Sequence, residues 1–69
     1  MGPVAIRVKP ETDHELEIAR VVDRISIEGR LSPTAIDDII AHLDFAMNRS
    51  ESEFLVTYIR WRMDNPTRK

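Results

Sequence analysis

The residue types best suited to recognition chemistry form one short run near the C-terminus, Tyr58-Ile59-Arg60-Trp61-Arg62. Arginines contact phosphates and stack on rings, so their alternation with aromatic residues suits nucleic-acid binding. Tyr, Trp and Arg are also the commonest hot spots of protein interfaces. On a helix, Tyr58 and Trp61 point the same way with an arginine on either side, which equally suits a core edge with snorkelling arginines. Core edge, protein interface and nucleic-acid contact therefore all stay open for this run.

A second cluster, Asp37, Asp38 and His42, places carboxylates and an imidazole about one helical turn apart. These groups suit a metal or a shared proton, but a metal site takes further ligands from elsewhere, so we interpret the cluster as solvated surface. No nucleophile–base pair stands at helical spacing, and only Gly2 and Gly29 exist, too few for a phosphate loop. We predict a non-enzymatic protein with no metal and no cofactor.

Length and composition indicate one small folded domain. A chain of 69 residues buries only about 60% of its unfolded surface. Because it has no cysteine, disulfides and thiolate zinc sites are excluded, and we expect a homodimer to supply extra burial. The apolar fraction is 42% and no apolar run approaches the roughly 20 residues that span a bilayer. We expect a cytoplasmic protein with no membrane partner.

The net charge of -2 argues against a general nucleic-acid coat protein. Its distribution is uneven, since residues 1–48 hold five Lys/Arg against nine Asp/Glu, whereas residues 49–69 hold five against three. A mildly basic end on an acidic body is a candidate partner site, although an ordinary solvated surface is the simpler interpretation.

Three start signals divide the chain into amphipathic segments. Thr12-x-x-Glu15 and Ser50-x-x-Glu53 read as capping boxes, and Ser32-Pro33 reads as a cap followed by proline at the first helical position. We predict helices over about residues 13–27, 33–47 and 51–64. Gly29 is the expected stop of the first, at positive φ, and Asn65-Pro66 ends the third.

The apolar positions predict which faces are buried. The first helix should bury Ile18, Val21, Val22 and Ile25 and turn Glu15 outward. The second matches the helical template over Ile36, Ile39, Ile40, Leu43 and Met47. The third is apolar over too much of its circumference for one stripe, so we predict a dimer or partner interface there. That interface would comprise Phe54, Leu55, Tyr58, Ile59 and Trp61.

The fold class that follows is all-α, with three short amphipathic helices forming a homodimer. Residues 1–11 form an extended or disordered leader, because Val4, Ile6 and Val8 alternate with other residues as in a strand but are too few to pair alone. Residues 12–65 form the three-helix regulatory domain, and residues 66–69 form a C-terminal tail.

The spacing of the helical residues resembles a known family. The matching elements are Leu16-Glu17-Ile18, Val22, Ile25, Gly29-Arg30-Leu31-Ser32, Ile36, Ile39-Ile40, Leu43-Asp44, Phe54-Leu55, Ile59 and Met63. This order over residues 16–63 is similar to the small bacterial biofilm-development regulators of the YmgB/AriR type, which include YcgZ-like connectors. The resemblance implies an all-helical cytoplasmic homodimer that modulates a phosphorelay response regulator in biofilm and acid-stress control, with DNA as a further partner.

The alternative is a ribbon–helix–helix DNA-binding repressor. Val4–Lys9 would be its ribbon, placing Arg7 and Lys9 in the major groove. The first helix is about a turn too long for that fold, and a third strongly apolar helix is not required by it. The candidate nucleic-acid contacts are Arg7, Lys9, Arg60 and Arg62.

Overall fold

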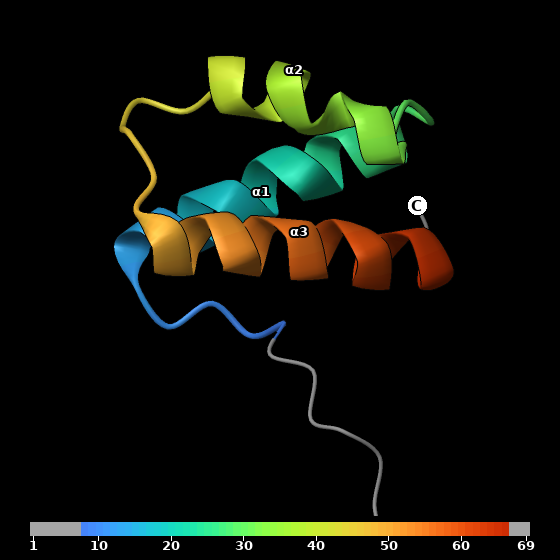
Figure 1. Ribbon diagram of the computed structural model, residues 1–69. Coiled ribbons are helices and arrows are strands. Elements are labelled where there is room, and N and C mark those ends of the chain that lie inside the picture. The colour runs from blue at the N-terminus through green and yellow to red at the C-terminus, as the bar shows by residue number, and fades with distance from the viewer. Residues whose placement is uncertain (1–7, 67–69) are drawn as a thin grey trace, which may run out of the picture.

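The computed structural model describes residues 8–66, and in that range it is built of helices with no strand. The elements in chain order are α1 (Asp13–Ile27), a single 3-10 turn η1 (Pro33–Ala35), α2 (Ile36–Ala41) and α3 (Arg49–Asp64). Helices α1 and α3 lie side by side and run in the same direction, and α2 runs back along α1 (Figure 1). The prediction of an all-α chain is confirmed. None of these helices is long and apolar enough to cross a membrane.

Helix α1 begins and ends where the sequence predicts. The Thr12 hydroxyl accepts a hydrogen bond of 3.1 Å from the Glu15 backbone N–H, which satisfies one of the donors that a helix start leaves unpaired. At the other end Gly29 has φ 75°, and the Arg30 N–H donates to the Ile25 carbonyl over 3.0 Å. This is the Schellman pattern, in which a residue at positive φ reverses the chain and closes the helix.

Helix α2 is much shorter than the predicted range of 33–47. Ser32 has the extended backbone of a cap and Pro33 follows it, as predicted, but the Ser32 side chain makes no capping bond to the backbone. The helix ends at Ala41, and the ring of His42 lies 2.8 Å from the carbonyl oxygen of Asp38, one of the last carbonyls that need a partner.

The segment after α2 is an irregular connection whose apolar side chains alternate with exposed residues. Leu43, Phe45 and Met47 are half-buried and pack against the core, whereas the residues between them are exposed. Phe45 also stacks on the His14 ring, with ring centroids 3.7 Å apart. A spacing of two places every second side chain inward along non-helical backbone, so these residues reach the core without a helix.

Helix α3 begins two residues earlier than predicted, because Asn48 rather than Ser50 is its cap. The Asn48 side chain accepts from the Glu51 N–H at 2.8 Å, and the Glu51 carboxylate accepts from the Asn48 N–H at 3.0 Å. Both arms of a capping box are therefore made at Asn48. The predicted Ser50–Glu53 box is wrong, and Ser50 lies within the first turn of the helix.

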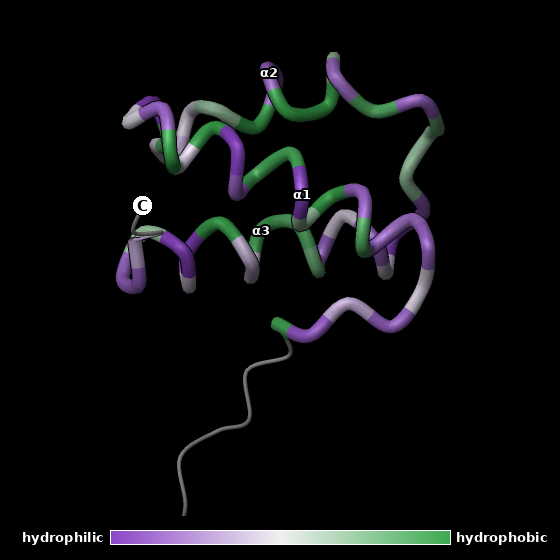
Figure 2. Tube along the Cα trace, turned by 180° about the vertical axis from the view of Figure 1, so that it is seen from behind, coloured by the Kyte–Doolittle hydropathy of each residue, from purple (hydrophilic) through white to green (hydrophobic). Residues whose placement is uncertain are grey.

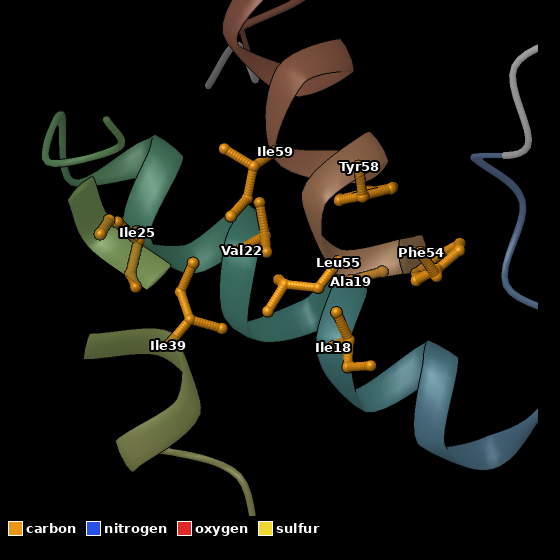
Figure 3. Close-up of a cluster of buried hydrophobic side chains, with 10 residues drawn as sticks. Ile18, Ala19, Val22, Ile25, Ile39, Phe54, Leu55, Tyr58 and Ile59 are labelled. Atoms are coloured by element: carbon orange, nitrogen blue, oxygen red, sulfur yellow. The ribbon is translucent and has the colours of Figure 1, made fainter. Parts of the chain in front are cut away.

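The core lies between the three helices, with α1 at its centre (Figure 3). Figure 2 shows the alternation of hydrophobic and hydrophilic stretches along each helix that makes this packing possible. The buried hydrophobic residues of the core are Ile18, Ala19, Val22, Ile25, Ala35, Ile39, Phe54, Leu55, Tyr58 and Ile59. The prediction that Glu15 points outward is wrong: it is only 2% exposed, and its carboxylate accepts from the Glu11 N–H at 2.9 Å.

Candidate functional site

The aromatic–arginine run belongs to α3, and part of it forms a polar network with α1. The Tyr58 hydroxyl and the Arg62 Nε each donate to the same oxygen of Asp23, both over 2.9 Å. Arg62 also donates to the Tyr58 hydroxyl over 3.0 Å and lies over the Trp61 ring, 4.3 Å from its centroid. One carboxylate on α1 thus holds two side chains of α3, Tyr58 and Arg62, which lie one turn apart.

This network commits Arg62 to the fold. Its side chain is 16% exposed and paired with Asp23, so the guanidinium faces its own chain rather than a nucleic acid. The pKa of Tyr58 is raised, first by burial and then by the hydrogen bond and charge of Asp23, partly offset by Arg62. Of the two arginines in the run, Arg60 alone is exposed, and it makes no ion pair with the described residues.

The residues predicted as a dimer or partner interface are mostly inside the single chain. Phe54, Leu55, Tyr58 and Ile59 are 1–4% exposed and pack against the rest of the core. Trp61 is half-buried beside them. The chain needs this stripe to cover α1, so in the folded single chain it offers no open surface. The apolar surface of α3 extends beyond this buried stripe, because Val56 and Met63 remain 44% and 41% exposed.

The leader contributes little that the structure describes. Arg7 and the first positions of the Val4–Lys9 ribbon lie outside the described residues. Val8 is half-buried and packs against the core of its own chain, and Lys9 is exposed; neither residue is in a strand. The ribbon of the DNA-binding alternative therefore stays a prediction.

The acidic cluster on α2 is a solvated surface in this fold. Asp37, Asp38 and His42 are all exposed, and Asp38 lies 3.4 Å from Arg30, which also pairs with Glu28. Across residues 8–66, no three His, Cys, Asp or Glu side chains come together in a way that could hold a metal ion. Asp38 therefore acts as a hydrogen-bond acceptor for Arg30, and this contact holds the loop after α1 against α2.

An open groove of about 850 Å³ runs along the outer side of α1 toward the end of α2. It is lined by Glu17, Arg20, Val21, Asp23, Arg24, Ile25, Ile27, Glu28, Arg30 and His42. Arg30 pairs with Glu28 and Asp38, and Asp23 pairs with Arg62, so these charges are balanced within the chain.

Arg20 and Arg24 are what this groove offers to a partner. Both are exposed and neither makes an ion pair with the described residues, whereas Glu17 is the one lining acid left to oppose them. Ile27, 46% exposed, adds an apolar contact beside them. The sequence pattern missed this surface, because two arginines on the outer face of an amphipathic helix read as ordinary solvated charge.

A separate cluster ties the starts of α1 and α3 together. His14 Nδ1 lies 2.9 Å from the Glu51 carboxylate, and the His14 ring is stacked on Phe45 with an interplanar angle of 7°. The pKa of Glu51 is lowered, chiefly by the hydrogen bond from the Asn48 backbone and then by the one from His14. His14 is 50% exposed, and its two partners lie far away in the chain, so no local sequence pattern indicates this contact.

No protein-family model, no curated protein and no solved structure matches this chain.

Proposed function

We propose that this chain is a small, non-enzymatic regulatory protein of the cytoplasm that acts as a homodimer by binding another protein. The observation that carries the proposal is the groove on α1, where Arg20 and Arg24 lack acidic partners in the described residues and precede the exposed Ile27 along the helix. Protein interfaces commonly combine a central apolar contact with a polar rim of complementary charge.

The chemistry of the groove selects the kind of partner. Two arginines against one free acid favour an acidic surface, and Val21 and Ile27 favour one with an apolar stripe. An amphipathic helix with acidic residues on its polar edges supplies both. The finer proposal, a connector that contacts a phosphorelay response regulator in biofilm and acid-stress control, draws its support from the resemblance in residue spacing over residues 16–63.

The ionic-strength dependence of binding tests this proposal against DNA binding. Phosphate contacts release counterions, so DNA affinity falls steeply as salt rises, whereas apolar burial against Ile27 is not screened. Purified response-regulator receiver domains and a DNA duplex pool are each titrated with the chain at low and at physiological salt. We expect receiver-domain binding that persists at physiological salt and weakens about tenfold in Arg20→Glu and Arg24→Glu variants.

Sequence-selective DNA binding at physiological salt, lost in Arg7→Ala and Lys9→Ala variants, would instead establish the ribbon–helix–helix alternative. For the receiver-domain titration the charge-matched control is Lys9→Glu, which reverses an exposed cation outside both the groove and α3.

A further inference from the structure

The outward side of α3 carries a second surface, opposite the stripe that packs on α1. Its members recur at helical spacing and are all exposed: Arg49, Glu53, Val56, Arg60, Met63 and Asp64. Two of them are large apolar side chains, Val56 and Met63, which lie two turns apart and are 44% and 41% exposed. We call these six residues the outer face of α3.

The charges of this face are ordered symmetrically with opposite signs. Arg49 and Asp64 lie equally far from the midpoint between Val56 and Thr57, and so do Glu53 and Arg60. When two identical helices pack antiparallel about a two-fold axis through that midpoint, each residue of one copy faces a different residue of the other copy. The facing residue lies equally far from the midpoint, on its other side. Arg49 then meets Asp64 of the second copy and Glu53 meets Arg60, so that every charge on the face opposes a charge of the other sign.

A parallel arrangement of the same two helices is disfavoured by the same charges. It would place Arg49 against Arg49 and Glu53 against Glu53, and like charges across a helix interface are repulsive. The antiparallel arrangement also places both copies of Val56 near the axis, where the interface is best shielded from water.

The charged groups are available for such a contact. Arg60 and Asp64 make no ion pair with the described residues. Arg49 and Glu53 form a pair at 3.5 Å, but their side chains are 93% and 71% exposed, so solvent screens that pair strongly. Little interaction free energy is lost when these two side chains turn to a second copy instead.

We propose that the outer face of α3 binds the same face of a second copy, antiparallel and about a two-fold axis between Val56 and Thr57. This inference deepens the homodimer of the proposed function and rests on it. The contact is one four-turn helix against another, which is small for a protein interface, so the dimer is weak and sensitive to salt.

Charge reversal tests the pairing by sedimentation velocity of the full chain across a concentration series. Arg60→Glu turns two attractions per dimer into two repulsions and should raise the dissociation constant about tenfold or more. The double variant Glu53→Arg with Arg60→Glu restores opposite signs across the axis and should return most of the lost affinity. Circular dichroism reports whether each variant keeps its helices.

Chemical cross-linking tests the position of the axis. The chain has no cysteine, so a single introduced thiol gives an unambiguous signal. Val56→Cys should link into a covalent dimer with a short bismaleimide, and Ile40→Cys on α2, equally exposed at 44%, should not.

The outcomes separate this inference from the proposed function. A dimer whose affinity is unchanged by Arg60→Glu overturns the α3 contact and leaves the homodimer standing. A chain that stays monomeric at the highest concentration overturns both. The double variant Arg20→Glu with Arg24→Glu, in the α1 groove, should leave the dimer dissociation constant unchanged and lower the affinity for the partner protein.

Discussion

At the scale of single residues, Asp23 decides the role of the aromatic–arginine run. Tyr58 and Arg62 both donate to one of its oxygens, and this ties α3 to α1 across 35 and 39 residues of sequence. The helical spacing within the run leaves a core edge open as one of three interpretations, and the structure places Tyr58 there with Arg62 beside it. It cannot reveal Asp23, because a carboxylate on a distant helix becomes a partner only when the two helices pack.

The Tyr58 hydroxyl offers a direct measurement of this network. Burial and Asp23 favour the neutral phenol in the folded chain, so its pKa is raised above the ordinary value of about 10. The stability that this contributes is fully present below the unfolded pKa and is lost as pH rises toward the folded one. Tyr58 is the single tyrosine of the chain, so tyrosinate absorbance should titrate at higher pH in the folded protein than in urea.

Asp23→Asn is the control for that titration. It removes the charge that raises the pKa of Tyr58 and keeps the size of the side chain, so the titration should move toward lower pH. Identical titrations of folded and unfolded chain would show that Tyr58 is neither buried nor bonded to Asp23.

Gly29 gives a second test at this scale. Its φ of 75° is a conformation that side chains with a branched Cβ adopt with strain, and nothing lies within 4 Å of where a Cβ would stand. The cost of substitution is therefore a backbone cost. We expect Gly29→Val to lower the free energy of unfolding by about 1 kcal/mol or more, and Gly29→Asn, which tolerates this conformation better, to lower it less. Equal urea midpoints for the two variants and the parent would contradict the turn.

At the scale of elements, the sequence predicts the number of helices and the whole of α1, but not the limits of α2 and α3. Leu43 and Met47 fit a helical spacing from Ile39, and they fit a spacing of two with Phe45 equally well. The stacking of Phe45 on His14 is a tertiary contact that favours the non-helical connection. Local pattern alone cannot choose between two periodicities that share their endpoints.

The start of α3 shows the same ambiguity in its caps. Asn48-x-x-Glu51 and Ser50-x-x-Glu53 overlap, and the chain uses the first, whose glutamate also contacts His14. We predict that Asn48→Ala lowers the free energy of unfolding by about 1 kcal/mol, because a helix N–H loses its acceptor.

Ser50→Ala is the matched control for the cap and should change stability by no more than a few tenths of a kcal/mol. Thermal or urea unfolding of the two variants decides between the caps. A larger loss for Ser50→Ala than for Asn48→Ala would restore the cap that the sequence alone suggested.

At the scale of the whole molecule, the chain uses its predicted interface as a core and keeps two other surfaces exposed. The over-wide apolar circumference of α3 predicts a second contact for this helix, and in the single chain Val56 and Met63 stay exposed. It does not indicate which side faces inward, because Ile18 and Val22 on α1 decide that by packing. The groove with Arg20 and Arg24 lies on α1, whereas the proposed dimer contact is the outer face of α3, so partner binding and dimerisation can be tested separately.

Site-specific photo-cross-linking in cells of the source organism tests whether the α1 groove binds another protein. A photoreactive residue replaces Ile27 in the α1 groove in one strain and Ile40 on α2, which is similarly exposed, in another. We expect a discrete cross-link from position 27 to a different protein, its loss when Arg20→Glu and Arg24→Glu are added, and no such product from position 40. A protein cross-link from position 27 that survives both charge reversals would contradict partner binding at this groove. So would cross-links from position 27 to DNA with none to a protein.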